Sequence, residues 1–164
     1  NMFVTTSLCS PSRASFLSGL YAHSHGVVNN FTDYPTSLPS FPRSLQTAGY
    51  ETAYIGKWHM GEQSDERRPG FDYWVAIPGQ GRTMDPELYE EGRIHEVPGY
   101  ITDVLTDRAI SFIQEDRDQP FFLYIAHNAP HYPLQAPEED IKKYDGVYDD
   151  GWDKEEPQVN VKFG

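Results

Sequence analysis

The sequence predicts an α/β fold, in which helices pack on a mainly parallel sheet. Segments with strand and helix patterns alternate along the chain, and this alternation favours parallel pairing between consecutive strands. Polar side chains also cluster directly after three predicted strands, and ligands of such sheets bind beyond the carboxyl ends of strands. Hydrophobic residues make up 38% of the 164 residues, which is enough for one packed core.

The first third of the chain contains two predicted strands and two predicted helices. We expect a short buried strand over residues 2–6, followed by a helix over residues 11–18 with Ser10 as its N-cap. Apolar spacing predicts a second helix over residues 40–48. Residues 50–55 alternate in polarity and are predicted to form the next strand.

The rest of the chain contains one long helix and one buried strand. Residues 62–100 are rich in glycine, proline and charge, so we expect an irregular excursion over the surface. Residues 101–116 are predicted to be helical because their apolar side chains form one stripe: Ile101, Val104, Leu105, Ala109, Phe112 and Ile113. Residues 121–126 are continuously apolar, which predicts a strand covered on both faces.

The charge and cysteine content exclude several classes of protein. The chain has 13 Lys and Arg against 25 Asp and Glu, a net charge of −12, which disfavours a broad nucleic-acid-binding face. No stretch has the length and hydropathy of a membrane span. The single cysteine, Cys9, excludes an internal disulfide and a cysteine zinc cluster. We expect a piece of a longer protein, with a partial catalytic domain over residues 1–152 and a divergent tail over residues 153–164.

Cys9 is the first candidate site residue. A lone cysteine is most often an inert buried residue, but Cys9 precedes a predicted helix start and Arg13 follows it. A thiolate phosphatase loop has five residues between cysteine and arginine, whereas this chain has three. A papain-like nucleophile would be a thiolate paired with a histidine, and the sequence near Cys9 does not decide whether such a pair forms.

Two further clusters supply cations and proton carriers. Lys57 and His59 are predicted to alternate with Trp58 at a strand end, so that both point the same way. His127 and His131 follow the last predicted strand. Each cluster taken alone is compatible with a structural role, but together the three predict a pocket for an anion at one edge of the sheet.

These clusters resemble the type I sulfatases. Residues 9–13, Cys-Ser-Pro-Ser-Arg, are similar to the signature in which that family's cysteine is oxidised to formylglycine (3-oxoalanine). Residues 49–61 are similar to the second signature of the family, and residues 120–133 to a third segment. The resemblance covers about residues 1–152 in order. It implies an alkaline-phosphatase-like fold and, as a partner, a formylglycine-generating or anaerobic sulfatase-maturating enzyme.

The resemblance also implies roles for the site residues. Hydrated formylglycine made from Cys9 would attack sulfur, and Arg13 would orient and neutralise it. Lys57 and His131 would hold the sulfate oxygens and assist the leaving group, with His127 as a rival to His131 in substrate binding. His59 would bind the hydrated aldehyde and assist release of sulfate. A plain serine or cysteine would remain trapped as a sulfated enzyme.

A calcium ion is implied by the same resemblance. The Cys9-derived group would be its one ligand from this chain, and the other ligands are expected before residue 1 and beyond residue 152. Asp149 and Asp150 look like a metal pair by residue type, but their setting predicts a solvated turn. His23 and His25 are interpreted as structural.

The expected activity is hydrolysis of a sulfuric ester, either a sulfated glycan or an aryl sulfate. Residues 19–30 and 68–74, with residues 79–81 after them, are similar to N-acetylglucosamine-6-sulfatases and favour a glycan 6-sulfate. Two alternatives remain open: a phosphodiester or phosphonate hydrolase of the same superfamily, and an inactive fragment that retains the motifs. A periplasmic, secreted or lysosomal location is expected from the family.

Overall fold

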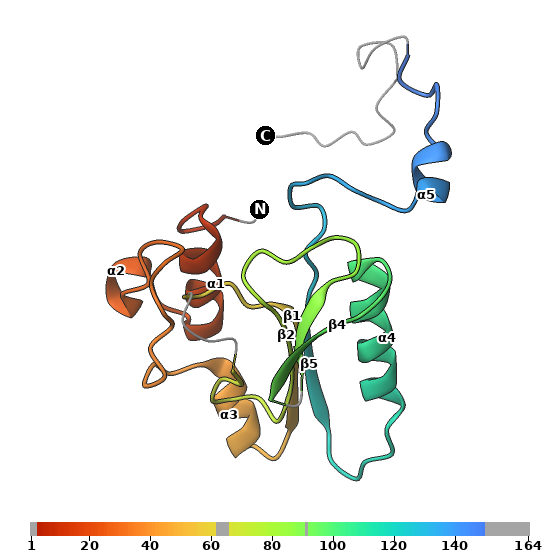
Figure 1. The fold of residues 1–164 in the computed structure, drawn as a ribbon. Coiled ribbons are helices and arrows are strands. Elements are labelled where there is room, and N and C mark those ends of the chain that lie inside the picture. The colour runs from red at the N-terminus through yellow and green to blue at the C-terminus, as the bar shows by residue number, and fades with distance from the viewer. Residues whose placement is uncertain (1–2, 62–65, 91, 150–164) are drawn as a thin grey trace.

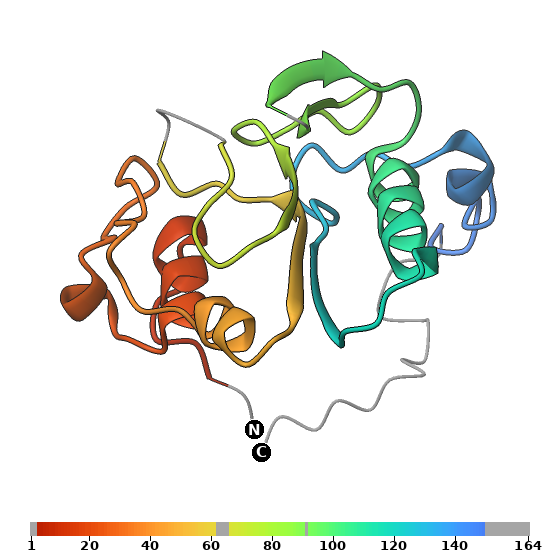
Figure 2. The same cartoon turned by 90° about the horizontal axis from the view of Figure 1, so that it is seen from below.

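The computed structural model describes residues 3–61, 66–90 and 92–149. A five-stranded sheet in the order β4-β3-β2-β1-β5 forms its centre, and helices cover both of its faces (Figures 1 and 2). The helices are α1 (Cys9–Ser18), α2 (Ala22–His25), α3 (Phe41–Thr47), α4 (Ile101–Gln114) and α5 (Glu138–Lys142). The strands are β1 (Glu51–Lys57), β2 (Tyr73–Ile77), β3 (Glu87–Glu90), β4 (Arg93–Glu96) and β5 (Phe121–Ala126).

The three central strands confirm the α/β prediction. Strands β2, β1 and β5 run parallel, and β3 and β4 extend the sheet as an antiparallel pair. Helices α1, α2 and α3 lie on one face and α4 lies on the other (Figure 1). Because β1 and β5 are parallel neighbours, with Gly56 opposite Ala126, the residues that follow them emerge at the same edge of the sheet.

The hydrophobic core has two halves, one on each face of the sheet. Tyr54 of β1 packs on the α1 side, where its ring stacks on Trp74 at 4.8 Å and meets Trp58 edge to face at 5.4 Å. Ala53 and Ile55 point to the opposite side and pack with the buried stripe of α4. Strand β1, which ends at the site, is therefore buried on both faces.

Gly56 allows β1 and β5 to approach each other closely. Its φ is +127°, and a Cβ at this position would lie 2.6 Å from the carbonyl carbon of Ala126. We therefore expect Gly56→Ala to lower the free energy of unfolding by at least about 2 kcal/mol, because the strands must separate. Urea denaturation measures this loss. Gly92→Ala, at a position with positive φ but nothing within 4 Å, is the matched control and should lose less. Equal losses in both variants would contradict the steric explanation.

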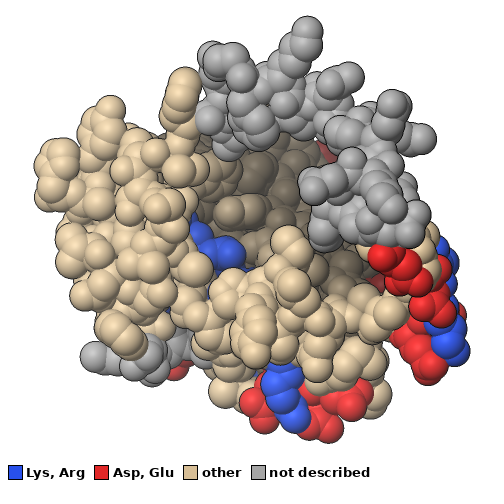
Figure 3. All heavy atoms as spheres, turned by 90° about the horizontal axis from the view of Figure 1, so that it is seen from above, with Lys and Arg blue, Asp and Glu red and all other residues tan. Residues whose placement is uncertain are grey.

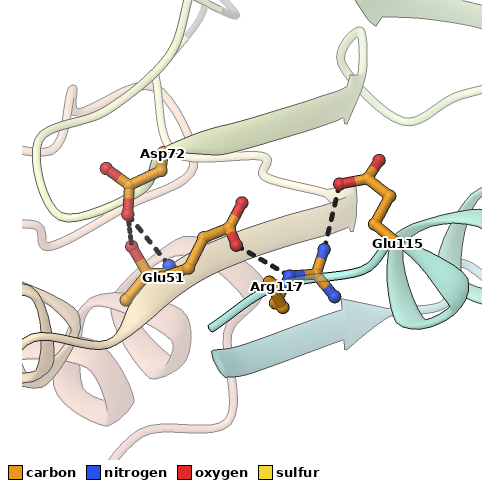
Figure 4. Close-up of polar contacts among 5 residues, drawn as sticks. Glu51, Asp72, Glu115 and Arg117 are labelled. Atoms are coloured by element: carbon orange, nitrogen blue, oxygen red, sulfur yellow. Dashed lines mark hydrogen bonds and ion pairs between the residues drawn. The ribbon is translucent and has the colours of Figure 1, made fainter. Parts of the chain in front are cut away.

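At the opposite end of the sheet, Arg117 ties the segment before β5 to the start of β1 (Figure 4). Its Nε lies 2.8 Å from Glu51 Oε2, and its second terminal nitrogen lies 3.0 Å from Glu115 Oε2. The guanidinium also lies 4.2 Å from the ring centroid of Phe112. Alongside, the Asp72 carboxylate accepts hydrogen bonds from the backbone and hydroxyl of Thr52. These contacts fix the amino ends of the central strands, far from the candidate site.

The prediction for the N-terminal segment is wrong in two respects. Residues 3–8 form no strand, and Phe3 is 86% exposed, because none of the described strands pairs with this segment. Helix α1 begins at Cys9 with Leu8 as its N-cap residue, so Ser10 is not the cap. Ser10 is instead buried, and its hydroxyl donates a hydrogen bond to the carbonyl oxygen of His59. The Ser10 hydroxyl thus bonds to a residue distant in the sequence and does not cap the helix.

The prediction of an irregular excursion over residues 62–100 is also wrong. The described part of this stretch contains β2, β3 and β4, and β2 is buried from Trp74 to Ile77. Strand β5 has its predicted bounds, but it lies at the edge of the sheet and only Ala126 is buried. Helix α4 is confirmed, except that Ile113 is 50% exposed.

Among the described residues, no helix is both long and apolar enough to cross a membrane. The predicted tail over residues 153–164 lies outside the described residues.

Candidate active site

A cavity of about 650 Å³ lies at the carboxyl ends of β1 and β5. Seen from above, this end of the molecule is hollowed, with Lys or Arg atoms on the floor of the hollow (Figure 3). The cavity brings together residues from all three predicted clusters: Cys9 and Arg13 from α1, Lys57 from β1, and His127 and His131 from the segment after β5. His59 does not line it, although it contacts the network around Lys57 described below.

Helix α1 presents Cys9 as its first residue, partly exposed to the cavity. The next residue anchors this end of the helix. Ser10 donates its backbone N–H to Asn30 Oδ1 at 3.1 Å, and its hydroxyl donates to the His59 carbonyl. The N-terminal N–H groups of a helix attract negative charge, so a group built on Cys9 would lie in a field that favours anions.

Arg13 and Tyr54 join α1 to the end of β1. The Arg13 guanidinium donates to the Lys57 carbonyl oxygen at 2.6 Å, and the Tyr54 hydroxyl donates to the same oxygen. Burial raises the pKa of Tyr54, so its hydroxyl remains a donor at neutral pH. Arg13 thus lines the cavity while one of its donors fixes the backbone that carries Lys57.

Lys57 is a buried cation at the cavity wall. It is 2% exposed, and its ammonium donates a hydrogen bond to Gln80 Oε1. Burial lowers the pKa of Lys57, Cys9 partly offsets this, and Arg13 lowers it further. A buried ammonium with a neutral amide as partner retains attraction for a bound anion, since no carboxylate neutralises it in this contact.

His59 departs from the strand geometry predicted for it. Strand β1 ends at Lys57, and His59 has a left-handed backbone with φ of 49°. Both side chains nevertheless reach Gln80, whose Nε2 lies 3.0 Å from His59 Nε2. Burial lowers the pKa of His59 to about 4, and the nearby charges of Lys57, Arg13 and His131 act in the same direction. His59 is therefore neutral near pH 7.

His127 and His131 both line the cavity and both are exposed, so the geometry does not choose between them. His131 Nδ1 lies 2.7 Å from the Tyr132 carbonyl oxygen, which only accepts, so Nδ1 carries a proton. This leaves Nε2 of His131 to exchange a proton with a bound group. His25 is structural as predicted: it is buried and hydrogen-bonds Ser15 and the backbone of Val27.

Two site residues were missed by the sequence analysis. Gln80 contacts both Lys57 and His59, whereas the sequence of residues 79–81 indicates only a similarity to N-acetylglucosamine-6-sulfatases, with no role for Gln80 at the site. Asn128 lines the cavity, is 8% exposed, and its Oδ1 has no hydrogen-bond partner in the described part of the chain. Its position directly after His127 was the available signal.

The described residues do not by themselves fit a calcium ion. Within residues 3–61, 66–90 and 92–149, no group of three or more His, Cys, Asp or Glu is placed to hold a metal. The cavity wall carries Arg13 and Lys57, which repel a cation, and calcium prefers oxygen ligands. Cys9 is the one predicted ligand at this place. Asp149 is exposed, and Asp150 lies outside the described residues.

The neutral state of His59 predicts a pH-dependent stability. Its pKa rises from about 4 in the folded protein to its ordinary value of 6.5 on unfolding, so the unfolded state binds the proton first. The free energy of unfolding should therefore fall by up to about 3 kcal/mol as the pH drops through this window. Urea denaturation at several pH values between about 4 and 6.5, on the native protein and on His59→Asn, measures this loss. The variant is the control, because the carboxylates and His25 titrate in both proteins. Parallel curves for the two proteins would refute the prediction.

The sequence of this chain is similar to those of known sulfatases. The family model described as Sulfatase matches residues 1–164. The chain is 38% identical over 135 residues to an N-acetylglucosamine-6-O-sulfatase of Bacteroides thetaiotaomicron, which covers 80% of this chain and 24% of that protein. It is 31% identical over 171 residues to the N-acetylglucosamine-6-sulfatase of Homo sapiens, which covers 89% of this chain and 30% of that protein. The chain thus spans about a quarter to a third of these relatives.

The fold of this chain is also similar to those of solved structures. One structure, described as a complex with its substrate D-glucosamine-2-N,6-O-disulfate, superposes with a TM-score of 0.80 at 35% identity, over 88% of this chain and 29% of that chain. A phosphonate monoester hydrolase of Agrobacterium radiobacter superposes with a TM-score of 0.58 at 19% identity, over 83% of this chain and 34% of that chain. The second likeness concerns the fold alone.

Proposed function

Because this chain belongs to the sulfatase family, we propose that it is the nucleophile-bearing part of an enzyme that hydrolyses sulfate esters of glycans. One observation carries the proposal: Cys9 and Arg13 of α1, Lys57 of β1 and His131 after β5 come from three separate segments and line a single cavity. A sulfate ester is a small anion, and it needs cations for its non-bridging oxygens and a proton for its leaving oxygen. The side chains at this cavity match both needs.

Each residue has a role that follows from its position. Lys57, buried beside the cavity, binds a non-bridging sulfate oxygen and stabilises the charge that develops as the S–O bond breaks. His131 exchanges a proton with the leaving oxygen through Nε2, because its Nδ1 is engaged with Tyr132. His127 lines the same wall and contributes to substrate binding. Arg13 orients the group on residue 9 while it holds the end of β1.

Residue 9 is proposed to act as formylglycine and not as a thiol. When formed, the hydrated aldehyde supplies two hydroxyl groups, one for attack on sulfur and one whose deprotonation releases sulfate. A formylglycine-generating or anaerobic sulfatase-maturating enzyme is the proposed partner for this oxidation. Calcium is the cation usual in the family, and its remaining ligands would come from residues outside this chain; none of the residue roles above depends on it.

A glycan 6-sulfate is the proposed substrate. The Bacteroides and human relatives both bear the name of an N-acetylglucosamine-6-sulfatase, and the substrate named for one structural neighbour is D-glucosamine-2-N,6-O-disulfate. The similarity of residues 19–30 and 68–74 to that class agrees with this choice. An aryl sulfate would use the same cavity, and the arylsulfatase G of Rattus norvegicus is 31% identical over 175 residues, against 38% over 135 residues for the Bacteroides protein.

The test is to express the full-length protein with and without a formylglycine-generating enzyme. We expect peptide mass spectrometry to show loss of sulfur from Cys9 only in the co-expressed protein, and only that protein to release sulfate from N-acetylglucosamine 6-sulfate. A phosphate diester and a phosphonate ester, assayed in parallel, test the alternative chemistry. Dominant turnover of either one, or full sulfatase activity with an unmodified Cys9, would overturn the proposal.

A further inference from the structure

We infer that Gln80 is a positioning residue that sets the tautomer of His59 and holds the ammonium of Lys57. The proposed function assigns Gln80 no role. The inference about the tautomer stands on hydrogen-bond chemistry alone. Its consequence for catalysis rests on the proposed function.

The orientation of the Gln80 amide follows from its first partner. A lysine ammonium has only donors, so the atom that Lys57 contacts must be the amide oxygen, Oε1. The amide nitrogen, Nε2, is then the atom that faces His59 at 3.0 Å. Lys57 thus removes the ambiguity between oxygen and nitrogen that a glutamine side chain otherwise has.

The tautomer of His59 follows from the amide. An amide nitrogen has only donors, so His59 Nε2 must accept, and in the neutral ring the proton then lies on Nδ1. Nδ1 is buried, with no hydrogen-bond partner in the described part of the chain. An unmet buried donor is unfavourable, and a bound acceptor would satisfy it. Gln80 therefore fixes the His59 proton on Nδ1, which remains an unmet donor in the described part of the chain.

The backbone places Gln80 where it can bridge both side chains. Ile77, the last residue of β2, is in register with Lys57 at the end of β1. Gln80 follows in a turn closed by a hydrogen bond from Gly81 N to Pro78 O at 3.1 Å. A Cβ at Gly81 would collide with the Ile77 side chain, so this turn is built around a glycine. The bridge thus spans neighbouring strand ends through a constrained turn.

The test measures the tautomer directly, by ¹⁵N NMR of the histidine rings of the protein near pH 7. A difference spectrum of the full-length protein against its His59→Asn variant assigns the signals of His59. We expect the Nδ1–H form in the native protein. In Gln80→Glu the carboxylate can only accept, so we expect the proton on Nε2 or a fully protonated ring. Gln80→Met should give a mixture of forms, and Gln114→Met, on exposed surface of α4, should leave the spectrum unchanged.

Activity of the matured full-length protein gives the second readout. We expect Gln80→Met to lower kcat about 10–100-fold with an unchanged unfolding transition, and Gln114→Met to have no effect. An Nε2–H tautomer in the native protein, or the same tautomer in all variants, overturns the inference. Unchanged kcat in Gln80→Met, with an active native protein, overturns the positioning role. Absence of sulfatase activity in the native protein counts against the proposed function, and the NMR comparison then still decides the tautomer.

Discussion

Cys9→Ala is expected to reduce sulfate ester hydrolysis by the matured full-length protein at least about 10³-fold. The side chain of residue 9 is the proposed nucleophile, and it lines the cavity together with Arg13 and Lys57. Alanine can be neither oxidised to an aldehyde nor sulfated. The fold should survive, since Cys9 is partly exposed and makes no disulfide. Initial rates of sulfate release, with the unfolding transition measured in parallel, check the prediction.

Cys9→Ser, produced without a maturating enzyme, tests whether the nucleophile needs the second hydroxyl of hydrated formylglycine. A serine can take the sulfuryl group but lacks the hydroxyl whose deprotonation would release it. We therefore expect a single turnover and a stable mass gain of one sulfuryl group on the peptide that contains residue 9. Full activity in Cys9→Ala would remove the mechanism. Sustained turnover by an unmodified serine variant would remove the need for formylglycine.

Lys57→Met is expected to lower kcat/KM about 10²–10³-fold, because the cavity loses the buried cation proposed to hold a sulfate oxygen. Methionine has a similar length and suits a site that is 2% exposed. Since burial lowers the pKa of Lys57, the ammonium is less stable in the folded protein than in water. Its removal should therefore leave the melting temperature unchanged or raised.

Lys142→Met provides the matched control for this variant. Lys142 lies on α5 with a side chain that is 68% exposed, and it pairs with Glu138 on the surface. Exposed pairs of this kind contribute little to stability, so both activity and melting temperature should stay close to native. Equal activity loss in the two lysine variants would show that general charge, and not the position of Lys57, matters. Unfolding of Lys57→Met alone would assign Lys57 a structural role.

Local patterns predicted part of this fold correctly. The apolar stripe of α4 and the continuous apolar run of β5 are properties of short windows, and both elements lie close to their predicted ranges. The interpretation of β5 as covered on both faces failed because burial depends on which strands pair with it, and β5 lies at the sheet edge. The strand expected before Cys9 failed for a related reason: none of the described strands pairs with it. Strand β2 was missed inside a stretch whose average composition is irregular.

For the candidate site too, part was predictable from the sequence and part depended on the tertiary structure. By itself, the sequence determined which residue types are available: a single cysteine, an arginine near it, and lysine and histidines after predicted strands. Their catalytic roles stay predictions. Only the tertiary structure decided that these segments share one cavity, because parallel pairing of β1 with β5 brings their carboxyl ends together. It alone placed Gln80 between Lys57 and His59, since that contact joins side chains more than 20 positions apart through the register of β1 and β2.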